Sequence, residues 1–326
     1  MRTPTFGIVC VGTLALAAIT LSAQQAPPAT EIYLAPVRAG AMPQIGAWIN
    51  ISNDPDYDNQ PSFLPDNSGI LFTSRRDGKQ TDIYRYDLAS KAVTQLTRTT
   101  ESEYSATVTP DRKSFSVIRV ESDGTTQRLW RFDLDGSNPR LVLENVKPVG
   151  YHAWIDETHL ALFVLGSPAT LQIADTTTGK AEVAATGIGR SVLVRPGVRT
   201  VSYMTAVQVP ADRAAGLQQV PASRQVMEWN PATRTSTALF APFETSQDAA
   251  WAPDGALWMA SGTKIMRRAT QDTEWSLLTD LAFPSSSNGV ILGPSGVLPA
   301  IKSITRMAIS PDGKWLAFVA EPVVAK

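Results

Sequence analysis

The sequence predicts an all-β fold, a six-bladed β-propeller with four-stranded blades, and a recurring hairpin motif carries the prediction. In each clear copy a Pro-Asp turn separates two apolar runs. The copies are residues 63–72, 108–117, 251–259 and 309–318, with degenerate versions at 154–163 and 194–203. The matching turn positions Asp66, Asp111, Glu157, Gly197, Asp254 and Asp312 are 45, 46, 40, 57 and 58 residues apart. Propeller blades repeat every ~40–50 residues, so each motif marks one blade.

Composition agrees with a globular chain and argues against two classes of partner. The 326 residues are 43% hydrophobic and 18% charged, which is ordinary for a soluble domain. The net charge is -1 and the pI is about 6.2. This balance gives no electrostatic reason to expect a nucleic acid or an anionic membrane surface as partner.

The N-terminus has the pattern of an export signal. Arg2 precedes a largely apolar run at residues 6–21, and Ala23 completes a small-residue cleavage site. We expect a signal peptide at 1–23, a flexible mature N-terminus at 24–29, and one propeller domain at 30–326. The predicted location is the periplasm or the exterior, with no transmembrane segment after cleavage. Cys10, the single cysteine, would be removed with the signal.

Four strands can be assigned within the first repeat. They are expected at residues 60–64, 70–74, 83–88 and 92–97. The turn between the first two has a local cause, because Pro65 fixes φ and Asp66 can accept hydrogen bonds from the backbone ahead. Gly69 is expected to take the positive φ of this turn.

Later repeats offer counterparts of the third and fourth strands, at residues 129–134, 140–143, 171–175, 225–230, 234–239, 264–268 and 275–278. The sixth repeat ends too soon, because Lys326 follows shortly after its second strand at 315–319. Residues 31–34 resemble a third strand, and residues 47–51 can form a fourth. We therefore expect the N-terminal strands to complete the sixth blade, which closes the ring without an exposed edge.

At residues 57–63, 70–78 and 82–84 the chain resembles the TolB-type, WD40-like propeller repeat proteins of bacterial periplasms. The resemblance covers residues 30–326. It implies six blades with a Pro-Asp turn in each, and it raises a role as an envelope assembly component related to the Tol system. TolB itself carries a small α/β domain before its propeller, and we expect none here.

The first strand of each propeller blade lines the central channel, so the residues that enter these strands should surround one mouth of it. We expect ligand contacts from polar and aromatic residues at these entries: Asp58, Asn59, Gln60, Glu103, Tyr104, Tyr151, His152, Arg190, Asp248 and Arg306. The alternative is that they are solvated loop ends, which are polar by default. Two insertions, 207–224 and 281–302, are expected on the same face, either as binding loops or as neutral decoration.

No catalytic or metal-binding motif is found. Gly-x-Ser-x-Gly is absent, and only His152 and His159 could act as a base, with His159 expected on the opposite face. Asp54, Asp56 and Asp58 have the alternate spacing of a calcium loop but lack its glycine and distal glutamate. Calcium is the one cofactor left open.

The expected function is therefore a non-catalytic, monomeric binding or protein-interaction module that takes a protein or small-molecule ligand. A hydrolase or lyase that uses carboxylates at the channel mouth is the alternative.

Overall fold

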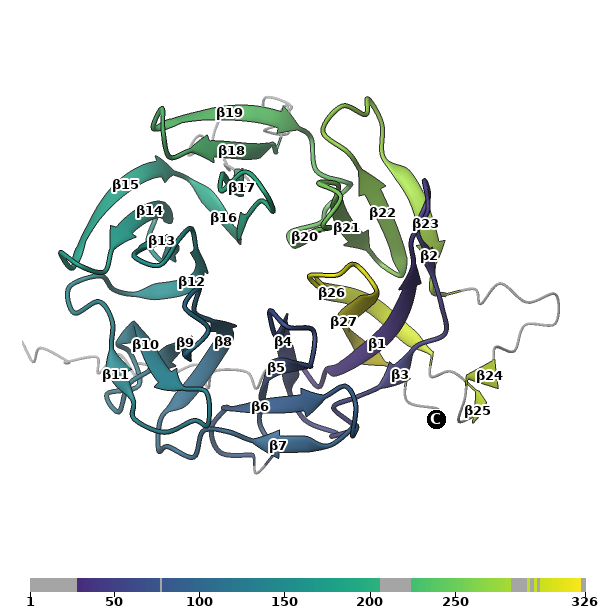
Figure 1. Cartoon of the computed structure of the whole chain (residues 1–326), viewed down its shortest axis with the longest axis horizontal. Helices are drawn as coiled ribbons and strands as arrows, with labels where there is room; N and C mark the ends of the chain where they lie inside the picture. Colours follow the sequence, from purple (N-terminus) through teal and green to yellow (C-terminus); the bar gives the residue numbers. More distant parts are fainter. Residues whose placement is uncertain are drawn as a thin grey trace, which may run out of the picture.

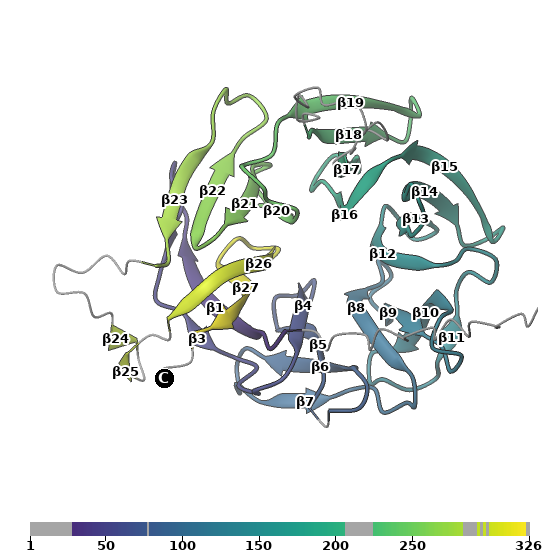
Figure 2. The same cartoon turned by 180° about the vertical axis from the view of Figure 1, so that it is seen from behind.

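Each hairpin motif folds into the two innermost strands of one blade. The computed structural model describes residues 28–76, 78–205, 224–282, 292–293, 296–297 and 300–323. Within this part, five four-stranded antiparallel sheets and a sixth sheet, in which two short strands share the outermost place, surround a central axis (Figures 1 and 2). The predicted six-bladed propeller is confirmed.

Five blades follow the chain in order, each running from the innermost strand outward. The first is β4 (Asp58–Phe63), β5 (Gly69–Ser74), β6 (Asp82–Asp87) and β7 (Val93–Gln95), and the second is β8 (Ser102–Val108), β9 (Ser114–Val120), β10 (Gln127–Asp133) and β11 (Arg140–Leu141). The third is β12 (Val149–Trp154), β13 (His159–Val164), β14 (Thr170–Asp175) and β15 (Lys180–Thr186). The fourth is β16 (Ile188–Val194), β17 (Val201–Thr205), β18 (Val226–Asn230) and β19 (Thr235–Phe240), and the fifth is β20 (Ala249–Trp251), β21 (Leu257–Ser261), β22 (Lys264–Arg268) and β23 (Ser276–Asp280).

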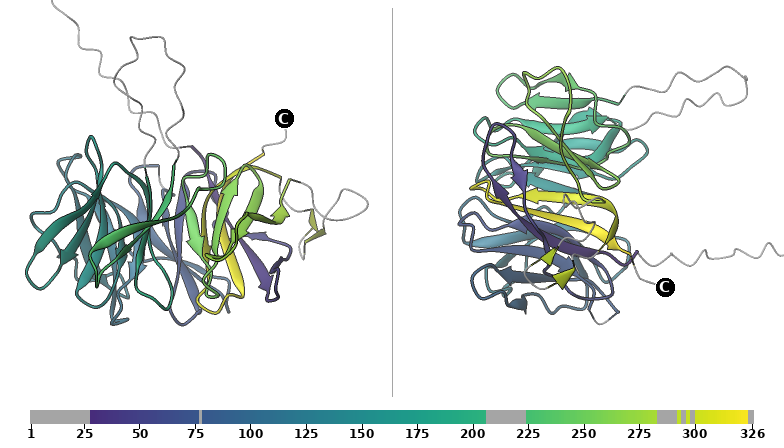
Figure 3. Two further views of the ribbon diagram at one scale, coloured as in Figure 1. Left: turned by 90° about the horizontal axis from the view of Figure 1, so that it is seen from above. Right: turned by 90° about the vertical axis from the view of Figure 1, so that its right-hand side faces the viewer.

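The sixth blade is built from both ends of the chain, as predicted. Its inner strands are β26 (Ile301–Ile309) and β27 (Trp315–Pro322), and β1 (Glu31–Arg38) pairs with β27 from Glu31↔Ala320 to Pro36↔Trp315. Two short strands, β2 (Gln44–Ile45) and β3 (Ile49–Asn50), share the outer edge of β1. The side views in Figure 3 show β1 beside β27. A separate pair, β24 (Leu292–Gly293) and β25 (Gly296–Val297), lies outside the blades.

The Pro-Asp turn forms where expected, but its positive φ lies elsewhere. Asn67, not Gly69, takes φ 60°, and the equivalent position in the sixth blade is Gly313 with φ 71°. Gly69 is needed for space instead, because a Cβ there would lie 2.4 Å from the carbonyl oxygen of Tyr86 on the next strand. The glycine thus permits close packing of β5 on β6.

The hydrophobic core lies between neighbouring blades rather than at one centre. Tyr33 of β1 stacks on Phe318 of β27 with ring centroids 5.3 Å apart, and Trp258 of the fifth blade is buried in the same cluster. The expected signal segment, Cys10, nearly all of the insertion at 207–224 and more than half of the insertion at 281–302 lie outside the described residues. In the part of the chain that the structure covers, no helix is long and apolar enough to cross a bilayer.

Candidate ligand-binding channel

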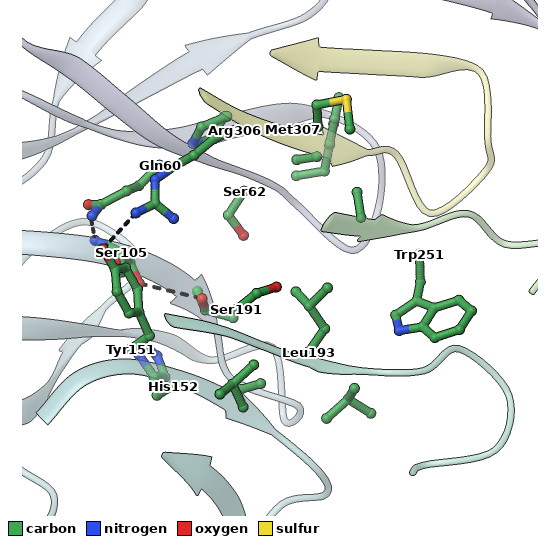
Figure 4. Close-up of a pocket in the computed structure, with 18 of the residues that line it drawn as sticks. Gln60, Ser62, Ser105, Tyr151, His152, Ser191, Leu193, Trp251, Arg306 and Met307 are labelled. Carbon is green, nitrogen blue, oxygen red and sulfur yellow. Dashed lines mark hydrogen bonds between the residues drawn. The ribbon is translucent and has the colours of Figure 1, made fainter. Parts of the chain in front are cut away.

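The innermost strands of all six blades line a central cavity of about 510 Å³ (Figure 4). One end, here called the entry mouth, is where the chain enters these strands, and it carries Tyr151, Arg190, Asp248 and Arg306. The other end is bordered by the Pro-Asp side of the hairpins, through Pro110, Pro196 and Pro311. The predicted separation of the two faces is therefore reflected in the cavity lining.

A charged network crosses the entry mouth. Asp248 forms ion pairs with Arg190 and with Arg306, whose Nη1 lies 3.3 Å from Asp248 Oδ1. Arg306 Nη2 donates to the Tyr151 hydroxyl at 2.6 Å, and its guanidinium lies over the Tyr151 ring at 4.8 Å. Two guanidinium groups share one carboxylate, so the network has one excess positive charge.

A second, polar cavity of about 310 Å³ opens beside this network, between the fifth and sixth blades. It shares Arg190, Asp248 and Arg306 with the channel, and Gln247 and Ser261 contribute to its walls. The entry mouth therefore adjoins a second cavity, which offers hydrogen-bonding groups on one side.

Irregular inner strands help to shape the channel wall. Register shifts occur in β4, β8, β12, β16 and β26, all close to the entry mouth. Gln60 and Ser105 take positive φ at two of them, and the side-chain oxygen of Gln60 accepts from the Ser105 amide at 2.8 Å. Such bulges re-aim side chains, and a motif search in one sequence gives no signal for them.

His152 lies deeper in the channel wall. Its Nε2 is 2.7 Å from the hydroxyl of Ser116, which also accepts from Trp154 Nε1 at 2.9 Å and donates to the carbonyl of Thr107 at 3.2 Å. The tautomer of His152 decides whether Nε2 donates to Ser116 or accepts from it. Nδ1 has no partner among the described residues. Burial lowers the pKa of His152 to about 4, so the ring is neutral at physiological pH.

Beyond His152 the channel is lined mainly by apolar residues, with Ser62 and Thr107 among them. Val108, Leu193, Val194, Met307 and Ile309 are only partly buried, and each packs against a hydrophobic cluster while also lining the cavity. The sequence gives no signal for these residues, because an apolar position in a strand has the same pattern whether it faces a core or a channel.

The other predicted contacts lie outside the cavity. Asn59 accepts from the Gln60 amide at 2.8 Å, and Tyr104 packs on the core between the second and third blades. Asp58 and Glu103 are both 0% exposed. At that burial neither carboxyl reaches a ligand, and neither joins Gln60, Tyr151, His152, Arg190, Asp248 and Arg306 in the lining.

The two buried acids have different surroundings. Burial raises the pKa of Asp58 to about 7, and the nearby Ser74 hydroxyl and Arg76 guanidinium offset this only in part. Burial also raises the pKa of Glu103 to about 7, although Thr99 donates to it at 2.6 Å and Arg119 Nε lies 3.0 Å away. Neither carboxyl lines the channel, where the carboxylate pair of the alternative enzyme would have to meet its substrate.

The calcium-like carboxylates do not converge on a common point. Asp56 pairs with Arg75 at 2.5 Å, Asp54 accepts from the Asp56 amide at 3.2 Å, and Asp58 is buried in the blade. Across the described residues, no three His, Cys, Asp or Glu side chains gather in a way that could hold a metal ion.

These features define the class of the protein: a six-bladed β-propeller whose lined channel has a charged entry mouth. No family model matches the sequence. Among solved structures, the fold is similar to a chain assigned as TolB from Agrobacterium tumefaciens, with a TM-score of 0.64 and 15% identity over 90% of this chain and 99% of that one.

Two other solved structures share the architecture. TolB from Acinetobacter baumannii gives a TM-score of 0.55 at 12% identity, over 89% of this chain and 64% of that chain. A puromycin-hydrolyzing peptidase from Mycobacterium tuberculosis gives 0.52 at 11% identity, over 83% of this chain and 49% of the peptidase. The chain is therefore a six-bladed propeller structurally similar to TolB, and at these identities the similarity concerns the fold.

Proposed function

We propose that the protein is an exported, periplasmic β-propeller that acts as a non-catalytic binding module and takes its ligand at the entry mouth. The observation that carries this proposal is the convergence of Tyr151, Arg190, Asp248 and Arg306 on the open end of a lined cavity. Concave sites with a few converging polar groups are the usual location of ligand binding. The adjoining polar cavity enlarges the surface that a ligand or a partner's loop can contact.

The contact of His152 with Ser116, the serine hydrogen-bonded to it beside the channel, supports binding rather than catalysis. Ser116 is also within hydrogen-bond distance of Thr107 and Trp154, and no group in the described part of the chain orients His152 through Nδ1. A serine nucleophile needs both a base and an orienting acid. His159 pairs with Asp156 at 3.1 Å at the turn before β13, away from the channel lining.

Changing the entry mouth should abolish binding while leaving the fold intact. The variant Tyr151→Phe/Arg190→Gln/Arg306→Gln removes three donors, and hydrogen bonds to charged groups contribute roughly 1.5–3 kcal/mol each. We expect capture of periplasmic partners or ligands to fall by more than about 100-fold. The measurement is affinity capture from periplasmic extract followed by mass spectrometry, with thermal unfolding as the check on folding.

Arg234→Gln is the matched control, because Arg234 pairs with Glu182 on the outer rim, where both side chains are largely exposed. Capture by this variant should equal that of the wild type. Full capture by the triple variant would place binding elsewhere on the surface.

Export predicts a defined mature N-terminus. Cleavage after Ala23 would leave Gln24 as the first residue. Intact-mass measurement of protein from the periplasmic fraction should show this species. A full-length mass in the membrane or cytoplasmic fraction would contradict it.

A further inference from the structure

The channel separates charge from apolar surface along its length, and this separation suggests a class of ligand. We infer that the channel binds a small amphipathic acid, with its carboxylate at Arg190 and Arg306 and its apolar chain directed toward the Pro-Asp turns. This inference rests on the proposed function and specifies the ligand of the same site. Its volume of about 510 Å³ is in the range of small-molecule sites.

The head-group site is the guanidinium pair of the entry mouth. Asp248 neutralises one of the two charges, so one remains to be matched by an anion. Arg306 is also suited to a second acceptor, because its contact with Asp248 is long at 3.3 Å and a guanidinium has five N–H donors. Carboxylate geometry matches this planar fork, whereas an ammonium would meet like charge.

The tail site is the remainder of the channel. All charged residues among the described lining, Arg190, Asp248 and Arg306, belong to the entry mouth. Toward the other end, Leu193, Trp251, Met307 and Ile309 contribute apolar surface, and Figure 4 shows Leu193, Trp251 and Met307 around the channel. Burying a hydrocarbon chain there releases water from apolar surface at roughly 25 cal/mol per Å². A wholly polar anion would leave that surface hydrated.

The first experiment compares ligands that differ in one property. Decanoate, decylamine and acetate are titrated into the mature protein by calorimetry, below their micelle concentrations. We expect decanoate to bind at one site per chain, about tenfold or more tighter than decylamine, which has the tail without the anion, or acetate, which has the anion without the tail. Equal or tighter binding of decylamine would overturn the inference.

Single variants then test separately whether the carboxylate and the hydrocarbon tail bind where proposed. Arg306→Gln should weaken decanoate binding about tenfold or more through the head group, and Leu193→Gln should weaken it through the tail. Asp248→Asn should tighten binding, because it frees both guanidinium groups for the ligand. Arg234→Gln on the rim should have no effect. Unchanged affinity in Arg306→Gln, or weaker binding in Asp248→Asn, would overturn the placement.

The source of the acid is tested with an apolar pentapeptide carrying a free C-terminus and with its amidated form. Peptide binding that depends on the free carboxylate, without decanoate binding, would overturn the small-molecule inference. Failure of decanoate to bind, while the triple entry-mouth variant still loses its captured partners, would overturn this inference alone. Full capture by that triple variant would refute the proposed function separately.

Discussion

Removal of residues 30–52 is expected to unfold the whole propeller rather than to loosen one blade. These residues contain β1, β2 and β3, which supply the outer half of the sixth blade. Without them β27 becomes an unpaired edge, and the ring between the fifth and first blades opens. Far-UV circular dichroism during urea titration should show that the cooperative transition of the wild type is lost.

The expected size of the effect follows from burial. Ile32, Tyr33 and Leu34 are all 2% exposed or less. Truncation of one buried large side chain costs roughly 2–5 kcal/mol, and a domain is stable by only about 5–15 kcal/mol. Loss of all three, together with the β1–β27 hydrogen bonds, exceeds the available stability.

Single substitutions test the contribution of β1 to stability without deleting the strand. Tyr33→Ala removes the ring stacked on Phe318 and should cost about 3–5 kcal/mol by analogy with other aromatic truncations. Val183→Ala, at a residue of the outer strand β15 that is 58% exposed, should change stability by less than about 0.5 kcal/mol. A truncated chain that keeps the wild-type midpoint would show that β1 does not close the ring.

The repeat could be predicted from the sequence because the residues of each turn specify that turn locally. A Pro-Asp pair such as Pro65-Asp66 specifies a turn between two apolar runs, and the spacing of these turns gives the number of blades. The order of strands in a propeller blade also predicts which face holds the entries to the innermost strands. The residues predicted there include Tyr151, Arg190, Asp248 and Arg306, and these four do lie at the entry mouth. The sequence could not show that Asn67, rather than Gly69, takes the positive φ of the turn. Glycine is needed at position 69 because the carbonyl of Tyr86, on another strand, lies too close for a Cβ.

The repeat pattern could not predict which way individual side chains of the inner strands point. Asp58 and Glu103 lie eight residues before the turn positions of their repeats, whereas Tyr151, Asp248 and Arg306 lie six residues before theirs, and Asp58 and Glu103 are buried in the blades. The register shifts lie just after them, between Asn59 and Ser62 in β4 and between Tyr104 and Thr107 in β8. A shift of one residue reverses the side that a strand residue faces, and a bulge has no fixed signature in one sequence.

Burial of Asp58 leads to a pH dependence with a definite sign. Its pKa is about 7 in the folded protein, against an ordinary value of 3.8, because the carboxyl is desolvated. Between these values the native state holds a proton that the unfolded chain releases. The stability it contributes is therefore fully present below pH 3.8 and is lost as the pH rises to about 7. A shift of roughly three pKa units corresponds to about 4 kcal/mol as an order of magnitude.

Asp58→Asn removes this titratable group and leaves a side chain of nearly the same size and shape. Relative to the wild type, the variant should gain stability progressively from pH 4.5 to pH 8, by up to a few kcal/mol, since its side chain has no charge to bury. Urea unfolding at pH 4.5, 6 and 8 gives the difference. Both proteins keep a second pH dependence of the same sign from Glu103, whose pKa burial raises to about 7, and it cancels in the difference.

Asp123→Asn is the control of opposite sign. Hydrogen bonds from Thr126 and Thr125 hold the pKa of this exposed carboxyl well below its usual range, so its contribution is lost only in acid. The difference between Asp123→Asn and the wild type should be constant from pH 5 to pH 8. A similarly constant difference for Asp58→Asn would mean that Asp58 is ionised in the native protein, with a charge partner or water that outweighs its burial. A rising difference would make Asp58 a neutral acid that stabilises the first blade, separate from the charged mouth of the channel.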